Sequence, residues 1–182
     1  MHEIMVPQEI SISDINENYS LSPNNYKKLT IKNSKQKPLK YFLNSDIPYE
    51  KGKEPGSCFY VKKSEQIFLR NSCINNLQFS IDSEKYIYLN PNYFNDNMIV
   101  SGDVLLCTDA NIGDCCICIL DDEQIIFSSG LVKLNFSSEQ QKYYALAFLK
   151  DDYFRMQLDT KTPKGSTIRH SGDLFMECNI PI

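Results

Sequence analysis

The chain has 182 residues, enough for one domain to bury a substantial core without disulfide bonds. Its formal net charge of -4 argues against a protein that coats nucleic acid uniformly, and its apolar runs are much shorter than the roughly 20 residues that cross a bilayer. The seven cysteines are an odd number, and the amino terminus lacks a signal-peptide pattern. We therefore expect a reduced, cytoplasmic protein with buried thiols and no membrane segment.

The first basic segment follows a lead-in of residues 1–20, in which we expect a short edge strand. Ser22 and Pro23 form a typical helix start, which predicts a brief helix over residues 22–29. No acidic residue occurs from Asn18 to Ser45, and Tyr26, Tyr41 and Phe42 are interleaved with six lysines, Lys27, Lys28, Lys32, Lys35, Lys37 and Lys40. This segment is either a surface that follows DNA phosphates or a solvated loop.

Short strands are expected after the Pro- and Gly-containing loop of residues 46–57. The candidates are residues 58–62, 66–70, 77–81 and 85–90. Alternation in the last candidate sends Tyr86 and Tyr88 to one face and the intervening aliphatic residues to the other. The tyrosine face could stack on bases or a partner, or it could simply pack within the protein.

The segment from 98 to 134 predicts the β core. Its apolar runs are rich in Ile, Val, Leu and Cys, and they are separated by turn-forming residues at 101–103, 111–114, 121–123 and 128–130. This spacing is typical of a compact antiparallel unit.

Two helices are expected after the β core. Ser137 and Gln140 have the spacing of a capping box, which predicts a helix over residues 138–149, and a second helix is expected over 151–159. An acid-free loop follows at residues 160–172. The predicted fold class is α+β, with a curved, mainly antiparallel sheet and flanking helices at 22–29, 138–149 and 151–159.

Several motifs that suggest catalysis or metal binding are incomplete. The sequence Asn-Pro-Asn-Tyr at 90–93 is one proline short of the Asn-Pro-Pro-Tyr motif of adenine-N6 methyltransferases, and no Gly-x-Gly pair accompanies it. Period two places Cys116 and Cys118 on one face of a strand and Cys115 on the other, which favours buried cysteines over a metal site. A Ser-His-Asp triad would depend on His170 in the basic loop. We therefore predict no enzyme activity, metal or cofactor.

The order of motifs resembles the target-recognition domain of a type I restriction-modification specificity (S) subunit. The residues that carry the resemblance are Ile12 to Ile15, Leu21 to Pro23, Tyr26, Gly102 to Leu105, Ile112-Gly113, Leu131 to Leu134, Tyr143-Tyr144, Leu149, Gly165 to Thr167, His170 and Ile180 to Ile182. The loop at Asp109 to Asn111 departs from the small or Gly-containing loop common in the family. A long spacer helix would follow the final Ile-Pro in the family. The resemblance implies a lead-in at 1–20 and one recognition domain at 21–182 without that helix.

The resemblance also implies a function and partners. Such a domain is non-catalytic and recognises one half of a split double-stranded DNA target. The DNA adenine methyltransferase subunit and the restriction subunit of the same system perform methylation and cleavage. We expect the DNA-facing residues to come from the two acid-free segments, namely Lys35, Lys37, Lys40, Lys161, Lys164, Arg169 and His170. Arg169 is the expected base reader because its planar fork can grip guanine bidentately.

Three alternatives stay open at the level of sequence. The same domain could belong to a single-chain restriction-methyltransferase. A β-rich hydrolase or peptidase could be built around Ser101 to Asp103, although no upstream nucleophile motif accompanies that turn. A protein-interaction module would explain the acidic net charge.

Overall fold

The computed structural model describes residues 3–5, 28–30, 35–78, 80–93, 98–120, 124–163 and 169–182. Its strands are β1 (Glu3–Met5), β2 (Lys28–Thr30), β3 (Gln36–Pro38), β4 (Tyr49–Lys51), β5 (Tyr60–Val61), β6 (Gln66–Leu69), β7 (Ile74–Asn75), β8 (Ser80–Ile81), β9 (Ile87–Leu89), β10 (Met98–Ile99), β11 (Val104–Cys107), β12 (Cys115–Ile117), β13 (Gln124–Phe127), β14 (Leu131–Leu134) and β15 (Asn179–Pro181). The helices are α1 (Glu139–Leu149) and α2 (Asp152–Lys161), with short 3-10 turns that include η3 (Leu39–Phe42), η5 (Asn71–Cys73) and η7 (Leu174–Glu177).

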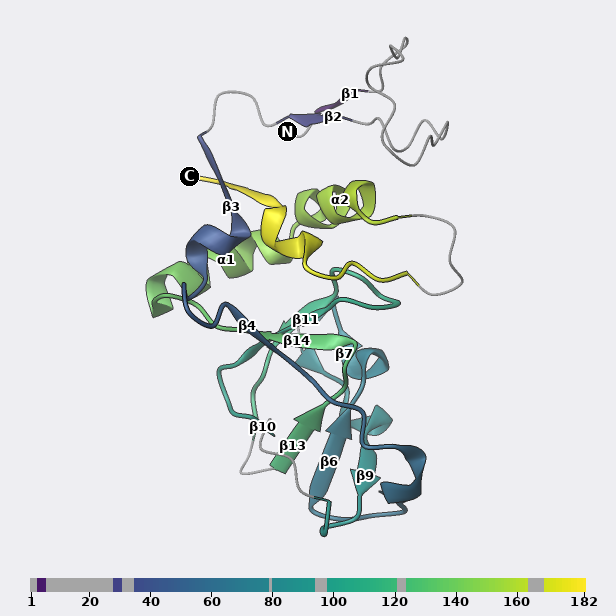
Figure 1. Ribbon diagram of the computed structural model, residues 1–182. Helices are drawn as coiled ribbons and strands as arrows, with labels where there is room; N and C mark the ends of the chain where they lie inside the picture. Colours follow the sequence, from purple (N-terminus) through teal and green to yellow (C-terminus); the bar gives the residue numbers. More distant parts are fainter. Residues whose placement is uncertain are drawn as a thin grey trace.

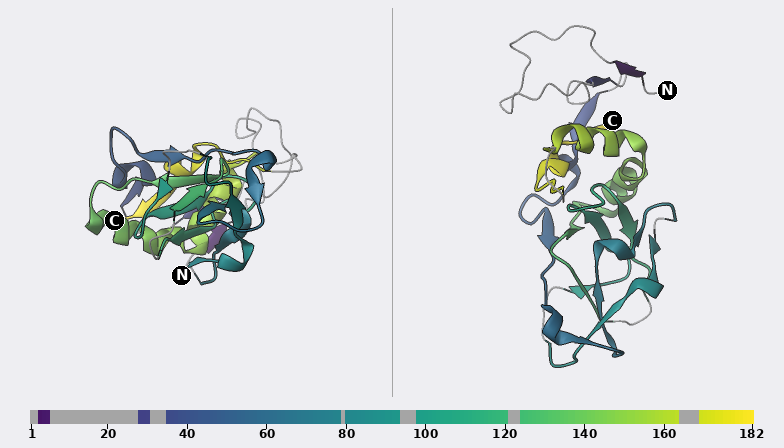
Figure 2. Two further views of the ribbon diagram at one scale, coloured as in Figure 1. Left: turned by 90° about the horizontal axis from the view of Figure 1, so that it is seen from below. Right: turned by 90° about the vertical axis from the view of Figure 1, so that its right-hand side faces the viewer.

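Two sheets and a helical layer form the body of the molecule. The four-stranded sheet has the order β12-β11-β14-β4, and the five-stranded sheet has the order β10-β13-β6-β9-β5. The two α helices lie at one end of the body and the five-stranded sheet lies at the other, with β11 and β14 between them (Figure 1). The right-hand view of Figure 2 shows the same succession after a quarter turn about the vertical axis. The fold is therefore mixed α+β and mainly antiparallel, and the predicted curvature of the sheet stays a prediction.

Side-chain alternation along β11 explains why the layers stack in this order. Val104 and Leu106 face the cluster that includes the apolar sides of α1 and α2. Leu105 and Cys107 point the opposite way, into the cluster between the two sheets. A strand that is covered on both faces is apolar at every position, and the sequence of β11, Val-Leu-Leu-Cys, has this pattern. All four side chains are fully buried.

The predicted direction of several side chains is confirmed. Tyr86 and Tyr88 pack against the cluster between the sheets, so this face is internal packing. Cys116 and Cys118 point into that same cluster, whereas Cys115 points toward the helices. Six of the seven cysteines are buried, all seven are free thiols, and Cys58 is exposed.

The predicted pairing of the segment 98–134 is wrong in part. Its strands divide between both sheets, because β10 and β13 belong to the five-stranded sheet while β11, β12 and β14 belong to the other. In addition, β13 pairs in parallel with β6, with Ile125 opposite Ile67. Alternation in a sequence fixes which face a residue takes, but it does not fix which strand lies alongside.

Local boundaries also differ from the expectation. Residues 28 and 29 of the predicted helix 22–29 lie in β2, which pairs with β1, and the rest of that helix lies outside the described residues. The predicted strand 58–62 begins as a 3-10 turn, and the predicted strand 77–81 is reduced to β8. Pairing with β1 overrides the local helix preference at residues 28 and 29. The turn at 57–59 is local, because the Phe59 N–H donates to the Gly56 carbonyl at 3.2 Å.

The two later helices are confirmed, but the cap of α1 is shifted by one residue. The Ser138 hydroxyl accepts a hydrogen bond from the Gln141 N–H at 3.2 Å and is the N-cap. Ser137, the predicted cap, instead donates its hydroxyl to the Leu43 carbonyl at 2.6 Å. Adjacent serines are equivalent in a capping pattern, and only the tertiary contact to Leu43 decides between them.

Candidate nucleic-acid interface

A polar cleft of about 470 Å³ opens where loops from both sheets meet. Its walls come from three loops, which follow β6, follow β11 and connect β13 to β14, together with two further residues. The lining is Arg70, Asn71 and Ser72 from the first loop, Asp109, Ala110 and Asn111 from the second, Ser128, Ser129 and Gly130 from the third, and Glu54 and His170. The two sheets therefore bring together residues that are far apart in the sequence.

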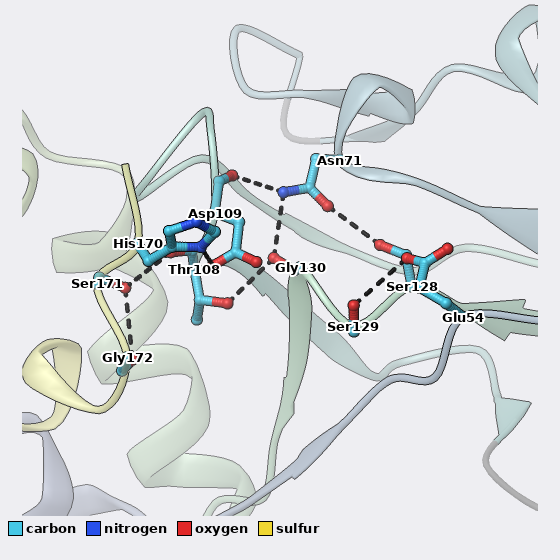
Figure 3. A network of polar contacts seen from close by, with 10 residues as sticks. All are labelled: Glu54, Asn71, Thr108, Asp109, Ser128, Ser129, Gly130, His170, Ser171 and Gly172. Atoms are coloured by element: carbon cyan, nitrogen blue, oxygen red, sulfur yellow. Dashed lines mark hydrogen bonds and ion pairs between the residues drawn. The ribbon is translucent and has the colours of Figure 1, made fainter. Parts of the chain in front are cut away.

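Asn71 connects three of these loops (Figure 3). Its side-chain Nδ2 donates to the Asp109 carbonyl at 2.6 Å and to the Gly130 carbonyl at 3.2 Å. Its Oδ1 accepts from the Ser128 hydroxyl at 3.1 Å. A Cβ atom at position 130 would lie 2.6 Å from Asn71 Oδ1, so only glycine fits there without displacing the brace. One amide thus links the loops at 70–72, 109–111 and 128–130.

Two buried residues behind the lining, Thr108 and Ser171, support the loops around Asp109 and His170. Thr108 donates its hydroxyl to the Gly130 carbonyl at 3.1 Å, and Ser171 donates its N–H at 2.8 Å and its hydroxyl at 3.2 Å to the Thr108 carbonyl. Asp109 and His170 form an isolated antiparallel bridge, and His170 Nδ1 lies 2.9 Å from Asp109 Oδ1 (Figure 3). The segment around His170 is therefore attached to the β11 loop along its main chain.

The structure places Arg169 beside the cleft but engages its side chain. Its Nη1 lies 2.6 Å from Asp159 Oδ1 on α2, and its Nη2 donates to the Asp159 carbonyl at 3.4 Å. The Arg169 carbonyl accepts from the Ala110 N–H at 3.0 Å, and Ala110 has a positive φ of 58°. Arg169 thus holds the 108–111 loop, and its guanidinium would have to leave Asp159 to contact a base.

The predicted lysines of the first basic segment lie along the edge formed by β3 and β15. Lys37 Nζ lies 4.7 Å from the centre of the Tyr41 ring. Lys40 Nζ forms an ion pair with Glu177 at 2.8 Å. This hydrogen bond lowers the pKa of Glu177, and the nearby charges of Lys40 and Lys161 lower it further. Lys40 and Lys161, from the two predicted basic segments, are therefore brought together around one carboxylate.

The remaining predicted residues are distributed over two places. Lys35 is exposed at the start of β3, and its carbonyl accepts from the Ile182 N–H at 2.8 Å. His170 lines the cleft with 61% of its side chain exposed. Lys164 lies outside the described residues. The structure thus places His170 in the cleft lining, Arg169 next to it in the chain but outside the lining, and the described lysines nearer the chain end and α2.

Sequence reasoning missed the cleft because its walls are separate in the chain. Arg70 is predicted only as the last residue of the strand 66–70, Asn71 is not singled out by any pattern, and Asn111 is predicted only as part of a turn. The turn at 128–130 carries a weak signal, since its glycine between Ser and Leu indicates a tight backbone position. No pattern in one sequence indicates that Asn71 will meet Gly130.

The cleft offers both donors and acceptors. Arg70, Asn111 and Ser72 can donate, whereas Glu54 and Asp109 present carboxylates. Among the residues that the structure describes, no group of three or more His, Cys, Asp or Glu side chains could hold a metal ion. Such a mixed lining suits the edges of bases better than a row of phosphates, which carboxylates repel. The Asn-Pro-Asn-Tyr segment at 90–93 forms a turn, in which the Tyr93 N–H donates to the Asn90 carbonyl at 2.8 Å.

Solved structures with the same fold come from type I restriction-modification systems. No family model and no curated protein matches the chain. A chain from a structure of complex assembly and conformational transition in the type I R-M system covers 84% of this chain with a TM-score of 0.57 and 15% identity. The S subunit from M. genitalium covers 84% with a TM-score of 0.53 and 12% identity.

A third structure, the HsdS subunit from Thermoanaerobacter tengcongensis, also covers 84% of this chain, with a TM-score of 0.53 and 13% identity. The chain has the fold of type I S subunits. It spans about a third of the length of these three chains, namely 35%, 35% and 34%. The S-subunit fold therefore accounts for most of this chain and for part of each neighbour. Within the described residues, no helix is long and apolar enough to span a bilayer.

Proposed function

We propose that this chain recognises a specific sequence in double-stranded DNA as the non-catalytic specificity component of a type I restriction-modification complex. The observation that supports the proposal is the S-subunit fold over 84% of the chain. Separate subunits of the same system, an adenine methyltransferase and a restriction subunit, then modify and cleave the DNA. In this proposal residues 1–20 are a lead-in and residues 21–182 form the recognition domain.

The distribution of charge suits two kinds of contact with DNA, namely lysines that contact phosphates and a cleft that contacts bases. Lys35, Lys37 and Lys161 are cations that can neutralise phosphates at the β3 edge and at the end of α2, and Lys40 would exchange Glu177 for a phosphate. The cleft, with its mixture of donors and acceptors, supplies groups that can distinguish bases. Lys164, Arg169 and His170 complete the proposed DNA face and stay predictions as contact residues.

The decisive experiment is selection from a randomised duplex pool with the full chain, alone and with the adenine methyltransferase subunit of the same system, at low and at higher salt. The expected result is enrichment of one short motif, with affinity that falls as salt rises. A duplex with the motif scrambled is the control. If neither assembly enriches a motif, sequence-specific recognition is disproved.

A further inference from the structure

The three arginines of this chain differ in what their guanidinium groups contact. Arg155 forms an ion pair with Asp114 at 2.7 Å, and Arg169 forms one with Asp159 at 2.6 Å. Arg70 is exposed, and its guanidinium has no hydrogen-bond or ion-pair partner within the described residues. Arg70 is also the arginine that lines the cleft. A cation of this kind is available to a ligand without first breaking an internal contact.

The backbone of Arg70 is held in place although its side chain is open. The Arg70 carbonyl accepts from the Cys73 N–H at 2.9 Å, which closes the turn η5, and its own N–H donates to Cys73 Sγ at 3.5 Å. The next residue, Asn71, is the brace of the cleft. The base of the Arg70 side chain is therefore fixed relative to the loops at 109–111 and 128–130.

Asn111 stands on the other side of the same cleft. Its side chain is exposed and has no hydrogen-bond partner within the described residues, while its carbonyl accepts from the Asp114 N–H at 3.0 Å. The preceding residue, Ala110, is fixed by the Arg169 carbonyl and has a positive φ. Two planar polar groups, a guanidinium and an amide, thus project from positions that the scaffold holds.

The chemistry of these two groups selects a partner. A guanidinium matches the O6 and N7 atoms of guanine, and an amide matches the N6 and N7 atoms of adenine. The carboxylates of Glu54 and Asp109 disfavour phosphates in the same cleft. We propose, resting on the proposed function, that this cleft reads base edges in the major groove, with Arg70 contacting guanine and Asn111 contacting adenine. The lysines outside the cleft then contact the phosphates of the DNA backbone.

The test compares Arg70→Ala, Arg70→Lys and Asn111→Ala with the wild-type chain in the duplex selection and in binding titrations at several salt concentrations. The control is Lys62→Ala, which removes an exposed cation outside the cleft lining. Arg169→Ala is included as the rival variant, because it removes the arginine that is paired with Asp159 and that the sequence suggests as a base reader. Circular dichroism and thermal unfolding establish that each variant is folded.

We expect Arg70→Ala to lose the preference for guanine at one position and about ten- to a hundredfold in affinity for the selected motif. Arg70→Lys keeps the charge but not the fork, so it should lose the same preference. Asn111→Ala should relax a different position, where adenine is preferred. Lys62→Ala should keep the motif unchanged.

The outcomes separate this inference from the proposed function. If the wild-type chain enriches a motif and both Arg70 variants enrich the same motif with equal strength, the inference is wrong and DNA recognition stands. If Arg169→Ala alone relaxes a guanine position, Arg169 is the reader and the inference is wrong as well. Failure of the wild-type chain to enrich any motif overturns both proposals.

Discussion

At the scale of single residues, the contact between Asn71 and Gly130 determines the shape of the cleft. Gly130→Ala would place a Cβ against the Asn71 amide, whose Oδ1 and Nδ2 lie 2.6 and 2.8 Å away. We expect it to lower the free energy of unfolding by about 1–3 kcal/mol through overpacking. Asn71→Ala should cost about 1–3 kcal/mol because it removes hydrogen bonds to two carbonyls.

A double-mutant cycle measured by chemical denaturation isolates this contact. In the Asn71→Ala background the obstruction at Gly130 is gone, so the second substitution should cost much less than it does alone. Equal costs in the two backgrounds would mean that Gly130 is required for another reason. Ser129→Ala, at the neighbouring position, serves as a control, since its hydroxyl makes one long contact of 3.4 Å with Glu54.

The thiols provide a second residue-scale prediction. Burial raises the pKa of the Cys115 and Cys178 thiols to about 12, and burial likewise raises that of Cys73. Only the thiolate reacts, so these groups should be inert in the folded chain. A thiol-reactive dye at mildly alkaline pH should label one cysteine per chain, the exposed Cys58, and all seven in denaturant. Cys58→Ser should abolish labelling of the folded chain; persistent labelling would show that a buried thiol is accessible.

At the scale of elements, the start of α1 depends on a single hydroxyl. Ser138→Ala removes the acceptor for the Gln141 N–H and should lower the free energy of unfolding by about 1 kcal/mol. Ser138→Asp keeps an acceptor at the cap and adds a negative charge at the helix amino terminus, so it should retain the stability. Denaturation of the two variants side by side makes the comparison. An equally unstable Ser138→Asp chain would rule out capping as the cause.

The elements themselves were largely predictable from sequence, whereas their partners were not. Periodicity identified α1, α2 and the central strands, and it assigned the faces of Tyr88 and Cys116 correctly. It could not indicate that β13 pairs with β6, because both strands are apolar on both faces and many partners satisfy such a pattern.

The same reason limited prediction of the candidate site. Acid-free stretches led to Lys40, Arg169 and His170, because charge composition is visible along the chain. The pairing of Arg169 with Asp159 and the brace at Asn71 depend on packing between distant segments, which a single sequence does not encode in any local pattern.

At the scale of the whole molecule, the proposed binding of DNA by a chain with a net charge of -4 requires its cations to be concentrated on one part of its surface. Lys37→Gln should therefore weaken binding evenly across DNA sequences and reduce the slope of log affinity against log salt by about one, without changing the selected motif. Lys85→Gln is the control, since Lys85 is paired with Asp82 at 2.9 Å on another part of the chain. An unchanged slope in the Lys37 variant would remove Lys37 from the DNA face.

The pairing of β3 with β15 has a consequence for how this body can be joined to other polypeptides. The Ile182 N–H donates to the Lys35 carbonyl at 2.8 Å, so the strands that open and close residues 35–182 lie side by side. A polypeptide connected to residue 35 and one connected to residue 182 would therefore join this body at the same edge, beside the β3–β15 pair. Residues 35–182 could therefore be inserted between two residues of another protein that lie close together, without separating the flanking parts of that protein. Because all residues that line the cleft lie within 35–182, exchange of this segment for another of the same fold would replace the whole cleft and leave the two connections to the surrounding protein unchanged.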